Sequence, residues 1–184
     1  MASNRKDIPF RFLDIEYVVK TDDGVFSKSD LDTGTESLLK VAVKQNISGN
    51  VCDVGCGIGV IGVVLSNYFD ITMTGIDVNP RAVELANINY QKYKVNGTNI
   101  LQDGLTESQK FDYIISNPPI RIGKEKMYRL FDQIYNSLNE GGSFLFVIRK
   151  SHGAKSAQAK CLEIFQSCEL LKKDKGFYIY LAVK

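Results

Sequence analysis

Short apolar segments with strand character alternate with amphipathic helical segments along most of this 184-residue chain. The expected strands cover residues 51–54, 71–76, 99–101, 111–116 and 143–148, and helical segments separate most of them. Alternation of this kind is typical of an α/β fold, in which parallel strands are joined by helices that cover both faces of the sheet. The sequence therefore predicts a doubly wound, mostly parallel, Rossmann-like sheet.

The two ends of the chain predict strands that pair antiparallel. Residues 169–173 and 177–183 are joined by a short turn, whereas a parallel crossover needs about a dozen residues, so they form an antiparallel pair at the C-terminal edge. The expected sheet then has seven strands. Near the N-terminus, residues 12–19 alternate apolar and polar before a turn signal at 22–24, which predicts a β-hairpin over about residues 8–30.

Several expected helices carry a start signal. Thr33 or Thr35 can cap the first helix with its hydroxyl group. Asn79 offers a capping side chain to a later helix, and Pro80 suits the first helical position because it lacks an N–H. Apolar residues at three-and-four spacing predict a further amphipathic helix over 124–139.

The four cysteines and the single histidine restrict metal and nucleophile chemistry. Cys161 and Cys168 are expected on one face of a last helix over 154–168, where burial is favoured over a disulfide. No Cys-x-x-Cys pair occurs and His152 is the only histidine, so no zinc site is indicated. A histidine-activated nucleophile is equally poorly supported.

Composition bounds the class of protein. With 44% hydrophobic residues, the chain is expected to fold as one domain over 1–184, in which the hairpin precedes a cofactor-binding core over about 33–184. Its net charge of +2, from 23 basic and 21 acidic residues, does not by itself indicate a nucleic-acid partner. No apolar run approaches the roughly 20 residues of a membrane helix, and Met1–Arg11 lacks the apolar core of a secretion signal, so a cytoplasmic protein is expected. The oligomeric state is not indicated.

Polar or glycine residues follow four different expected strands. Gly55–Gly57, Asp77, Asp103 and Asn117 each come directly after a strand, and the carboxyl ends of parallel strands share one edge of the sheet. Ligands of such sheets bind beyond that edge. The sequence therefore predicts that these residues converge on one site.

The segment Asp53-Val54-Gly55-Cys56-Gly57-Ile58-Gly59 predicts a glycine turn from a strand into a helix. Glycines let the backbone approach a ligand without a Cβ, and the N–H groups at the start of the helix point toward it. A carboxylate at Asp77 can accept hydrogen bonds from both hydroxyls of a ribose, and Asp103 can accept one from the amine of an adenine. These features fit NAD and S-adenosylmethionine alike.

The dinucleotide pattern keeps NAD open as an alternative. Gly57–Gly62 satisfies G-x-G-x-x-G, and Asp77 follows about 20 residues later. Gly55 and Cys56, however, would lengthen a turn that must be tight against a pyrophosphate, and the Asp53 carboxylate would repel that group. A cofactor with a cationic amino acid tail is favoured, which is S-adenosylmethionine.

The second motif, Ser116-Asn117-Pro118-Pro119-Ile120, suits a planar amine. The two prolines lack N–H groups and keep the backbone extended, so the Asn117 side-chain oxygen and a neighbouring carbonyl can accept both hydrogens of an NH2 group. The methyl group of a sulfonium is already activated, so alignment at roughly 3 Å supplies much of the catalysis. Together the two motifs predict methyl transfer to a nitrogen.

The chain resembles the class I S-adenosylmethionine-dependent methyltransferases of the small MTS group. Within that group it is most similar to the rRNA guanine-N2 methyltransferases related to ribosomal RNA small subunit methyltransferase C. The similarity covers nearly everything from Ile8 to Lys184. Its motifs are Gly24-Val25-Phe26-Ser27-Lys28 with Asp32, Gly34 and Thr35, then Asp53 to Gly59, Asp77-Val78-Asn79-Pro80, and Asn117-Pro118-Pro119-Ile120-Arg121 with Gly123-Lys124.

The resemblance implies a role for each matching segment. Phe26 and its neighbours are expected to close over the cofactor, and the catalytic segment holding the target amine is Asn117, Pro118, Pro119 and Ile120. The residues expected to contact S-adenosylmethionine are Phe26, Asp53, Gly55, Cys56, Gly57, Gly59, Asp77, Val78, Asp103, Gly104 and Asn117. Arg121 and Lys124 are expected to bind the substrate.

The resemblance also implies the acceptor, which is a guanine N2 amine in 16S rRNA. Relatives that act on adenine or glutamine usually have Tyr or Phe where this chain has Ile120, which favours guanine. Larger relatives carry an additional N-terminal domain that is not expected in this chain. The alternatives are methylation of adenine N6 or of a protein glutamine, an NAD-dependent oxidoreductase, and a module that binds cofactor or RNA without catalysis.

Overall fold

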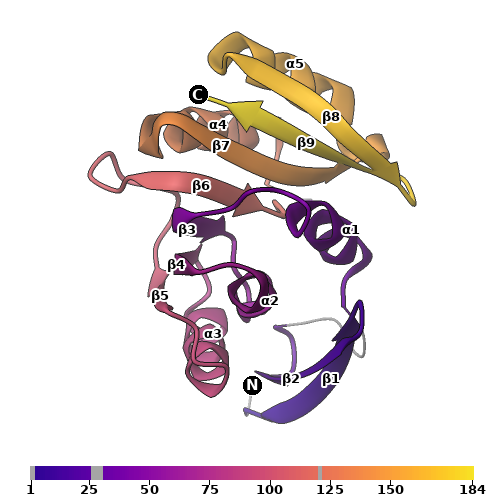
Figure 1. The fold of residues 1–184 in the computed structure, drawn as a ribbon, viewed down its shortest axis with the longest axis vertical. Coiled ribbons are helices and arrows are strands. Elements are labelled where there is room, and N and C mark those ends of the chain that lie inside the picture. The colour runs from indigo at the N-terminus through magenta and orange to yellow at the C-terminus, as the bar shows by residue number, and fades with distance from the viewer. Residues whose placement is uncertain (1–2, 26–30, 120–121) are drawn as a thin grey trace.

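The computed structural model describes residues 3–25, 31–119 and 122–184. Within these residues, two strands form an N-terminal hairpin and the others form a 7-stranded sheet in the order β5-β4-β3-β6-β7-β9-β8 (Figure 1). The strands are β1 Lys6–Phe12, β2 Ile15–Thr21, β3 Gly49–Val54, β4 Ile71–Asp77, β5 Gly97–Leu101, β6 Phe111–Ser116, β7 Leu138–Arg149, β8 Ser167–Asp174 and β9 Phe177–Val183. The helices are α1 Thr33–Ala42, α2 Val60–Tyr68, α3 Pro80–Lys92, α4 Lys124–Ser137 and α5 Ala154–Ile164, with a short 3-10 turn at Lys150–His152.

The pairing confirms the predicted fold class. Strands β3 to β7 pair parallel with their sheet neighbours, whereas β9 lies between β7 and β8 and pairs antiparallel with both. The C-terminal pair thus extends a doubly wound, mostly parallel sheet. Arg149, the last residue of β7, pairs with Phe177, the first residue of β9.

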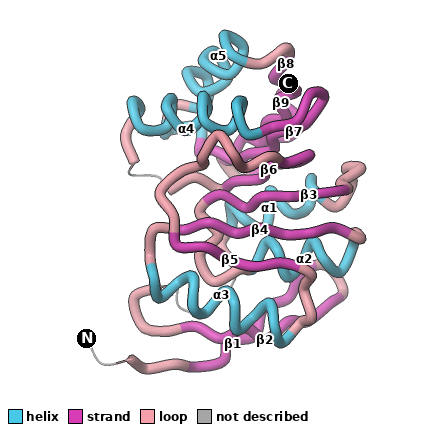
Figure 2. Tube along the Cα trace, turned by 90° about the vertical axis from the view of Figure 1, so that its left-hand side faces the viewer, coloured by secondary structure: helices cyan, strands magenta, loops and turns pink. Residues whose placement is uncertain are grey.

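Helices cover both faces of the sheet. Helices α1, α2 and α3 contribute to one hydrophobic core together with the hairpin, and α4 and α5 contribute to a second core on the other face. Figure 2 shows the strands stacked one above another with these helices on either side, and the two termini at opposite ends of the molecule. The first core therefore joins the hairpin to the sheet.

The N-terminal hairpin is confirmed, and a turn forms at residues 22–25, but it follows β2 and is not the turn that joins the two strands. The chain reverses at Leu13, which has a positive φ of 51° and is 47% exposed. Both strands place alternate apolar residues in one core, and the rings of Phe10 and Tyr17 stack across the pair at 5.1 Å. Because Leu13 is apolar, it extends the alternating pattern of β2 back into the turn, which hides the reversal in the sequence.

The two expected helix caps have different outcomes. Asn79 caps α3 as predicted, accepting hydrogen bonds from the backbone N–H groups of Arg81 and Ala82. The cap of α1 is Asp32 rather than a threonine, because its carboxylate accepts the N–H of Thr35. The acidic side chain also interacts favourably with the positive end of the helix dipole.

The predicted last helix is too long. Helix α5 ends at Ile164, so Cys161 lies on the helix and Cys168 lies on β8, not on one helical face. Both thiols are nevertheless buried and unbridged, as expected. Ser167 and Cys168 instead belong to β8, which pairs with β9 at the edge of the sheet.

Candidate active site

Two cavities open at the carboxyl edge of the sheet. The first, which we call the strand-end cavity, has a volume of about 650 Å³ and lies beyond the ends of β3, β4 and β5. The second, the Asn117 cavity, has a volume of about 510 Å³ and lies beyond the ends of β6 and β7. Pro119 and Ile122 line both cavities, so the two adjoin at the segment that follows Asn117.

The glycine turn is fastened to the end of the neighbouring strand β4. The N–H groups of Gly55 and Cys56 both donate to the carbonyl of Ile76, at 2.8 and 3.0 Å. The N–H of Gly57 donates to the Asp77 carboxylate at 2.9 Å. Gly55 and Gly57 have φ values of 76° and 54°, a conformation that favours glycine, so the residue type is set by the turn.

The Asp77 carboxylate holds the turn and also faces the strand-end cavity. Oδ2 accepts from Gly57 and Oδ1 accepts from the N–H of Asn79, both at 2.9 Å. A carboxylate oxygen has more than one lone pair, so each oxygen can accept a further hydrogen bond from a ligand. Next to it, Val78 is 65% exposed and offers an apolar surface.

Five of the expected cofactor-contacting residues line the strand-end cavity: Gly55, Asp77, Val78, Asp103 and Gly104. Cys56, Gly57 and Gly59 shape the turn behind this wall, and Asn117 faces the other cavity. Phe26, Ile120 and Arg121 lie outside the described residues. Lys126 and Arg129 also line it, as the basic residues that follow Asn-Pro-Pro indicate. Sequence reasoning missed the remaining wall residues, which are Val54, Ile76, Gln102, Ser116, Ile122, Leu130 and Gln133.

Asp53 lies beneath the turn and lines neither cavity. Its side chain is fully buried, and neither carboxylate oxygen has a hydrogen-bond partner among the described residues. Burial, assisted by the negative charge of Asp77, raises the pKa of Asp53 to about 8. The group is therefore held mainly as a neutral acid at neutral pH, so it does not place a full charge under the turn.

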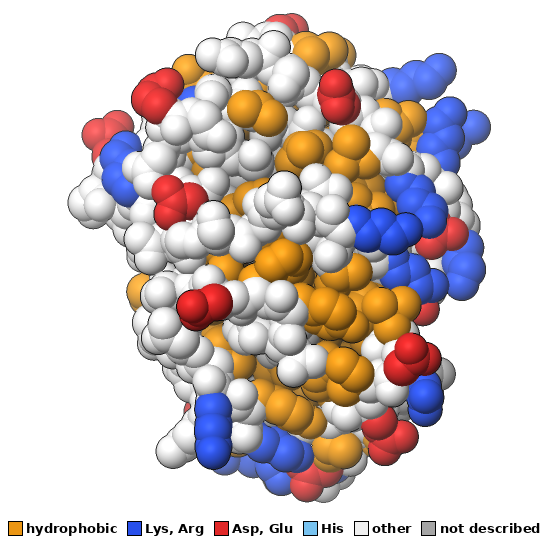
Figure 3. Space-filling model, viewed as in Figure 1, with side chains coloured by type: hydrophobic (Ala, Val, Ile, Leu, Met, Phe, Trp, Pro, Cys, Tyr) orange, Lys and Arg blue, Asp and Glu red, His pale blue; other side chains and the backbone are white. Residues whose placement is uncertain are grey.

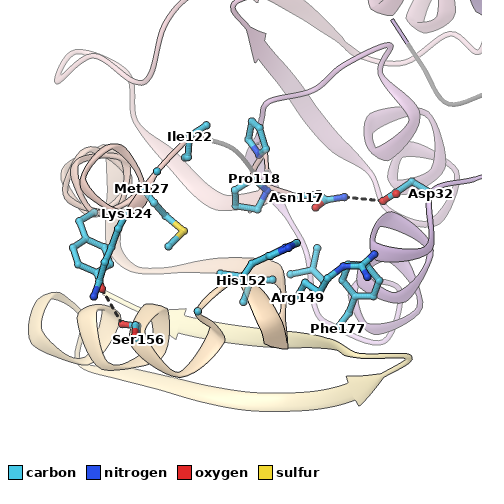
Figure 4. Close-up of a pocket in the computed structure, with 16 residues that line it drawn as sticks. Asp32, Asn117, Pro118, Ile122, Lys124, Met127, Arg149, His152, Ser156 and Phe177 are labelled. Atoms are coloured by element: carbon cyan, nitrogen blue, oxygen red, sulfur yellow. Dashed lines mark hydrogen bonds between the residues drawn. The ribbon is translucent and has the colours of Figure 1, made fainter. Parts of the chain in front are cut away.

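The side-chain amide of Asn117 is fixed by two acceptors from α1. Its Nδ2 donates to Oδ2 of Asp32 at 3.0 Å (Figure 4). It also donates to Oγ1 of Thr35 at 2.9 Å. An ionised carboxylate only accepts hydrogen bonds, so the reversed amide would set two oxygens against each other. The side-chain oxygen of Asn117 is consequently the atom left to accept a hydrogen bond from a ligand.

The other walls of the Asn117 cavity come from distant parts of the chain. Lys124, expected to bind the substrate, lies on the α4 wall with Met127 and Tyr128. Arg149 and Phe177 form the wall opposite, and the guanidinium carbon of Arg149 lies 4.7 Å from the ring centroid of Phe177. His152, Gly153 and Ser156 complete this side.

Some of these residues carried a sequence signal and others did not. Arg149 belongs to a basic cluster after an expected strand, and His152 follows in the next loop. Asp32 and Thr35 stand out only as part of a family motif, without an indication that they touch Asn117. Phe177 reads as an ordinary strand residue, and only its pairing with Arg149 brings it to the cavity.

A family model described as the methyltransferase small domain matches residues 16–181. This chain belongs to the methyltransferase small domain family. The predicted enzyme class, a methyltransferase, is thereby confirmed, and the oxidoreductase alternative is not supported. The match covers the sheet and both cavities described above.

Similar proteins are known at two different lengths. The uncharacterized protein YbxB of Bacillus subtilis is 37% identical over 189 residues, which is 100% of this chain and 94% of that protein. Ribosomal RNA small subunit methyltransferase C of Haemophilus influenzae is 39% identical over 67% of this chain and 39% of its own length. For the enzyme of the same name from Actinobacillus pleuropneumoniae, the values are 33%, 86% and 49%. The chain thus spans half or less of the length of these named methyltransferases.

Solved structures confirm the fold. The Thermus thermophilus 16S rRNA N2 G1207 methyltransferase (RsmC), in complex with AdoMet and guanosine, matches with a TM-score of 0.86 at 22% identity. The match covers 98% of this chain and 50% of that one. A putative SAM-dependent methyltransferase from Streptococcus mutans matches with a TM-score of 0.75 at 13% identity, over 97% of this chain and 55% of that one.

The described residues offer neither a membrane-spanning helix nor a metal-binding cluster. In residues 3–25, 31–119 and 122–184, no helix is long and apolar enough to cross a membrane. The same residues contain no group of three or more His, Cys, Asp or Glu side chains placed to hold a metal ion.

Proposed function

We propose that this chain transfers a methyl group from S-adenosylmethionine to the exocyclic N2 amine of a guanine in 16S rRNA. The observation that carries the proposal is the shared wall between the two cavities at Pro119 and Ile122. A methyl donor in the strand-end cavity and an amine in the Asn117 cavity would meet at this wall. The proposed arrangement uses a single domain, because the N-terminal hairpin packs in the same core as α1, α2 and α3.

The strand-end cavity fits the cofactor. The lone pairs left on the Asp77 carboxylate suit the two hydroxyls of a ribose, and Val78 offers an apolar surface to an adenine ring. Asp103 is exposed on the same wall and can accept from the adenine amine. When bound, S-adenosylmethionine supplies a methyl group that its sulfonium charge has already activated.

Asn117 positions the acceptor. Its fixed amide presents the side-chain oxygen to one hydrogen of the amine, and a carbonyl of the proline segment can accept the other. The charged hydrogen bond to Asp32 draws the amide N–H and polarises the amide, which makes the oxygen a stronger acceptor. Acceptors aimed at the nitrogen stabilise the positive charge that develops there, so no strong base is required.

The comparisons support guanine in 16S rRNA as the acceptor. The named relatives with 39% and 33% identity are ribosomal RNA small subunit methyltransferases, and the structure with the TM-score of 0.86 is a 16S rRNA N2 guanine methyltransferase with AdoMet and guanosine. A protein that acts on ribosomal RNA would work in the cytoplasm, and the described residues contain no membrane-spanning helix.

Labelled S-adenosylmethionine and small ribosomal subunits lacking the modification provide the test. We expect the label in N2-methylguanosine after nuclease digestion and mass analysis of the nucleosides. Label in N6-methyladenosine or in protein glutamine would contradict the acceptor. The absence of any transfer to RNA or protein would contradict the enzyme function as a whole.

A further inference from the structure

Arg149 lies over an aromatic ring at the mouth of the Asn117 cavity. Arg149 and Phe177 are directly opposite in the antiparallel pair of β7 and β9, so their side chains share one face of the sheet. The guanidinium carbon lies 4.7 Å from the ring centroid, within the range of a cation–π contact. The side chain of Arg149 is exposed, whereas the ring beneath it is only 7% exposed.

The ring of Phe177 is packed against α1 and has no room to move away from Arg149. A Cβ placed on Gly34, in the first turn of α1, would lie 2.9 Å from Cε1 of Phe177, so helix and ring are already in close contact. Phe177 is thus clamped between α1 and Arg149. The contact with the ring restricts the positions open to the guanidinium, so less side-chain entropy is lost when Arg149 binds a ligand.

The side-chain donors of Arg149 have no partner among the described residues. There the side chain makes no hydrogen bond or ion pair, and its contact is with the ring of Phe177. A guanidinium carries five N–H donors in a planar fork that matches two oxygens of a phosphate. An exposed fork with all donors free is suited to an oxyanion.

A second donor and further positive charge lie nearby. Figure 4 shows His152 beside Arg149, with its ring toward Asn117, while Lys124 lies on the far side of Met127. Exposed lysines at the end of β8 and on the turn between β8 and β9 continue the positive charge away from the cavity: Lys172, Lys173 and Lys175. In Figure 3, Lys and Arg side chains gather along the right-hand margin of the molecule, where Figure 1 places this turn.

We infer that Arg149 and His152 form a phosphate-binding site for the RNA strand that carries the target base. The inference rests on the proposed function and adds to it the contact that seats the strand. A base turned into the cavity toward Asn117 leaves its sugar and phosphate at the mouth, where Arg149 binds a phosphodiester oxygen pair and His152 donates beside it. Base identity is then set at Asn117, and the strand is held at Arg149.

Binding of a fluorescein-labelled single-stranded RNA, with one guanine in a run of uridines, tests the site by anisotropy at several salt concentrations. Arg149→Ala should weaken binding about tenfold and reduce the slope of log affinity against log salt by about 0.7, the share of one phosphate on a single strand. Arg149→Lys keeps the charge but not the fork, so binding should weaken about threefold with the slope unchanged. His152→Ala should also weaken binding. Guanosine, which lacks a phosphate, should bind the wild type and Arg149→Ala equally.

Two control variants define the outcomes that overturn the site. Lys92→Ala removes a lysine that also lies over a ring, 5.7 Å from the centroid of Tyr93, near the hairpin at the other end of the molecule, and it should not change RNA binding. Lys173→Ala removes a charge from the end of β8, at a residue that does not line the cavity. If Lys173→Ala weakens binding as much as Arg149→Ala, or if Arg149→Ala binds like the wild type, the site is wrong.

Methyl transfer by the wild type is measured in the same preparation. If the wild type methylates guanine in RNA while Arg149→Ala binds RNA normally, this inference fails and the proposed function stands. If Arg149 binds RNA as described but no guanine is methylated, the proposed function fails.

Discussion

The two cavities that adjoin at Pro119 are built in different ways. The strand-end cavity takes its glycine turn and its carboxylates from the ends of β3, β4 and β5, at Gly55, Asp77 and Asp103, and α4 supplies a further wall. The Asn117 cavity combines α1, the end of β6, α4, the end of β7 and the start of β9. One cavity is therefore encoded by local turn chemistry and the other by the packing of distant segments. We therefore expect substitutions in one cavity to leave the function of the other cavity unchanged.

The largest expected effect belongs to Asn117, where the acceptor is held. Asn117→Ala should lower kcat about 100-fold, the loss typical of removing one group that stabilises developing charge. The affinity for S-adenosylmethionine should stay within about twofold of the wild type, because the cofactor surface lies in the other cavity. Calorimetry and single-turnover transfer measure the two quantities, and unchanged turnover would remove Asn117 from the mechanism.

Asp77 provides the complementary test on the cofactor side. Asp77→Ala should weaken S-adenosylmethionine binding about 30-fold, because it removes charge-assisted hydrogen bonds to a ribose and releases the N–H of Gly57. RNA binding should be unchanged. Asp70, an exposed carboxylate just before the other end of β4, is the matched control, and Asp70→Ala should bind the cofactor normally. Equal losses in both variants would show a general effect of charge.

The buried acid under the glycine turn should make stability depend on pH. The folded chain raises the pKa of Asp53 from an ordinary 3.8 to about 8, so the native state retains a proton that the unfolded chain releases. Its contribution is fully present below pH 3.8 and is lost progressively as the pH rises to about 8. Between these values the free energy of unfolding of the wild type should fall by about 1.4 kcal/mol per pH unit relative to that of Asp53→Asn.

Urea denaturation at several pH values measures this difference. Asp112 is the control, because hydrogen bonds from the backbone of Asn50 and the side chain of Asn139 lower its pKa. Asp112 is ionised in both the folded and the unfolded state at neutral pH. The difference in free energy of unfolding between wild type and Asp112→Asn should therefore not change as the pH approaches neutrality. If the difference in free energy of unfolding between wild type and Asp53→Asn is also independent of pH, Asp53 is not held as a neutral acid.

The smallest expected effect concerns the orientation of Asn117. Thr35→Val removes one acceptor of the Asn117 amide but leaves the backbone N–H of Thr35 on the Asp32 cap. We expect kcat to fall about fivefold with the melting temperature and KM unchanged, because Asp32 still favours the productive amide orientation. Thr33→Val, an exposed position of the same helix, should have no effect. Equal activity in both variants would show that Thr35 does not orient the amide.

Expectations based on local sequence agree best with the structure. The polar residues after the strands were expected to share one edge, and Gly55, Asp77, Asp103 and Asn117 all line cavities there. Asn79 caps its helix as expected because the capping residue and the proline are adjacent. The hairpin turn was misplaced because apolar Leu13 continues the alternating pattern, and only the pairing of β1 with β2 shows the reversal.

The sequence alone determined the order of strands and helices and the side of the sheet where ligands bind, because periodicity and turn chemistry act over a few residues. The tertiary structure alone decided that Asp32 lies against Asn117, 85 residues away, that β9 inserts beside β7 and brings Phe177 under Arg149, and that Asp53 is buried behind the turn. Each of these contacts joins segments that are far apart in the sequence and lie side by side only in the folded protein. The free energy of such contacts comes from packing and desolvation, which the order of residues along the chain does not display.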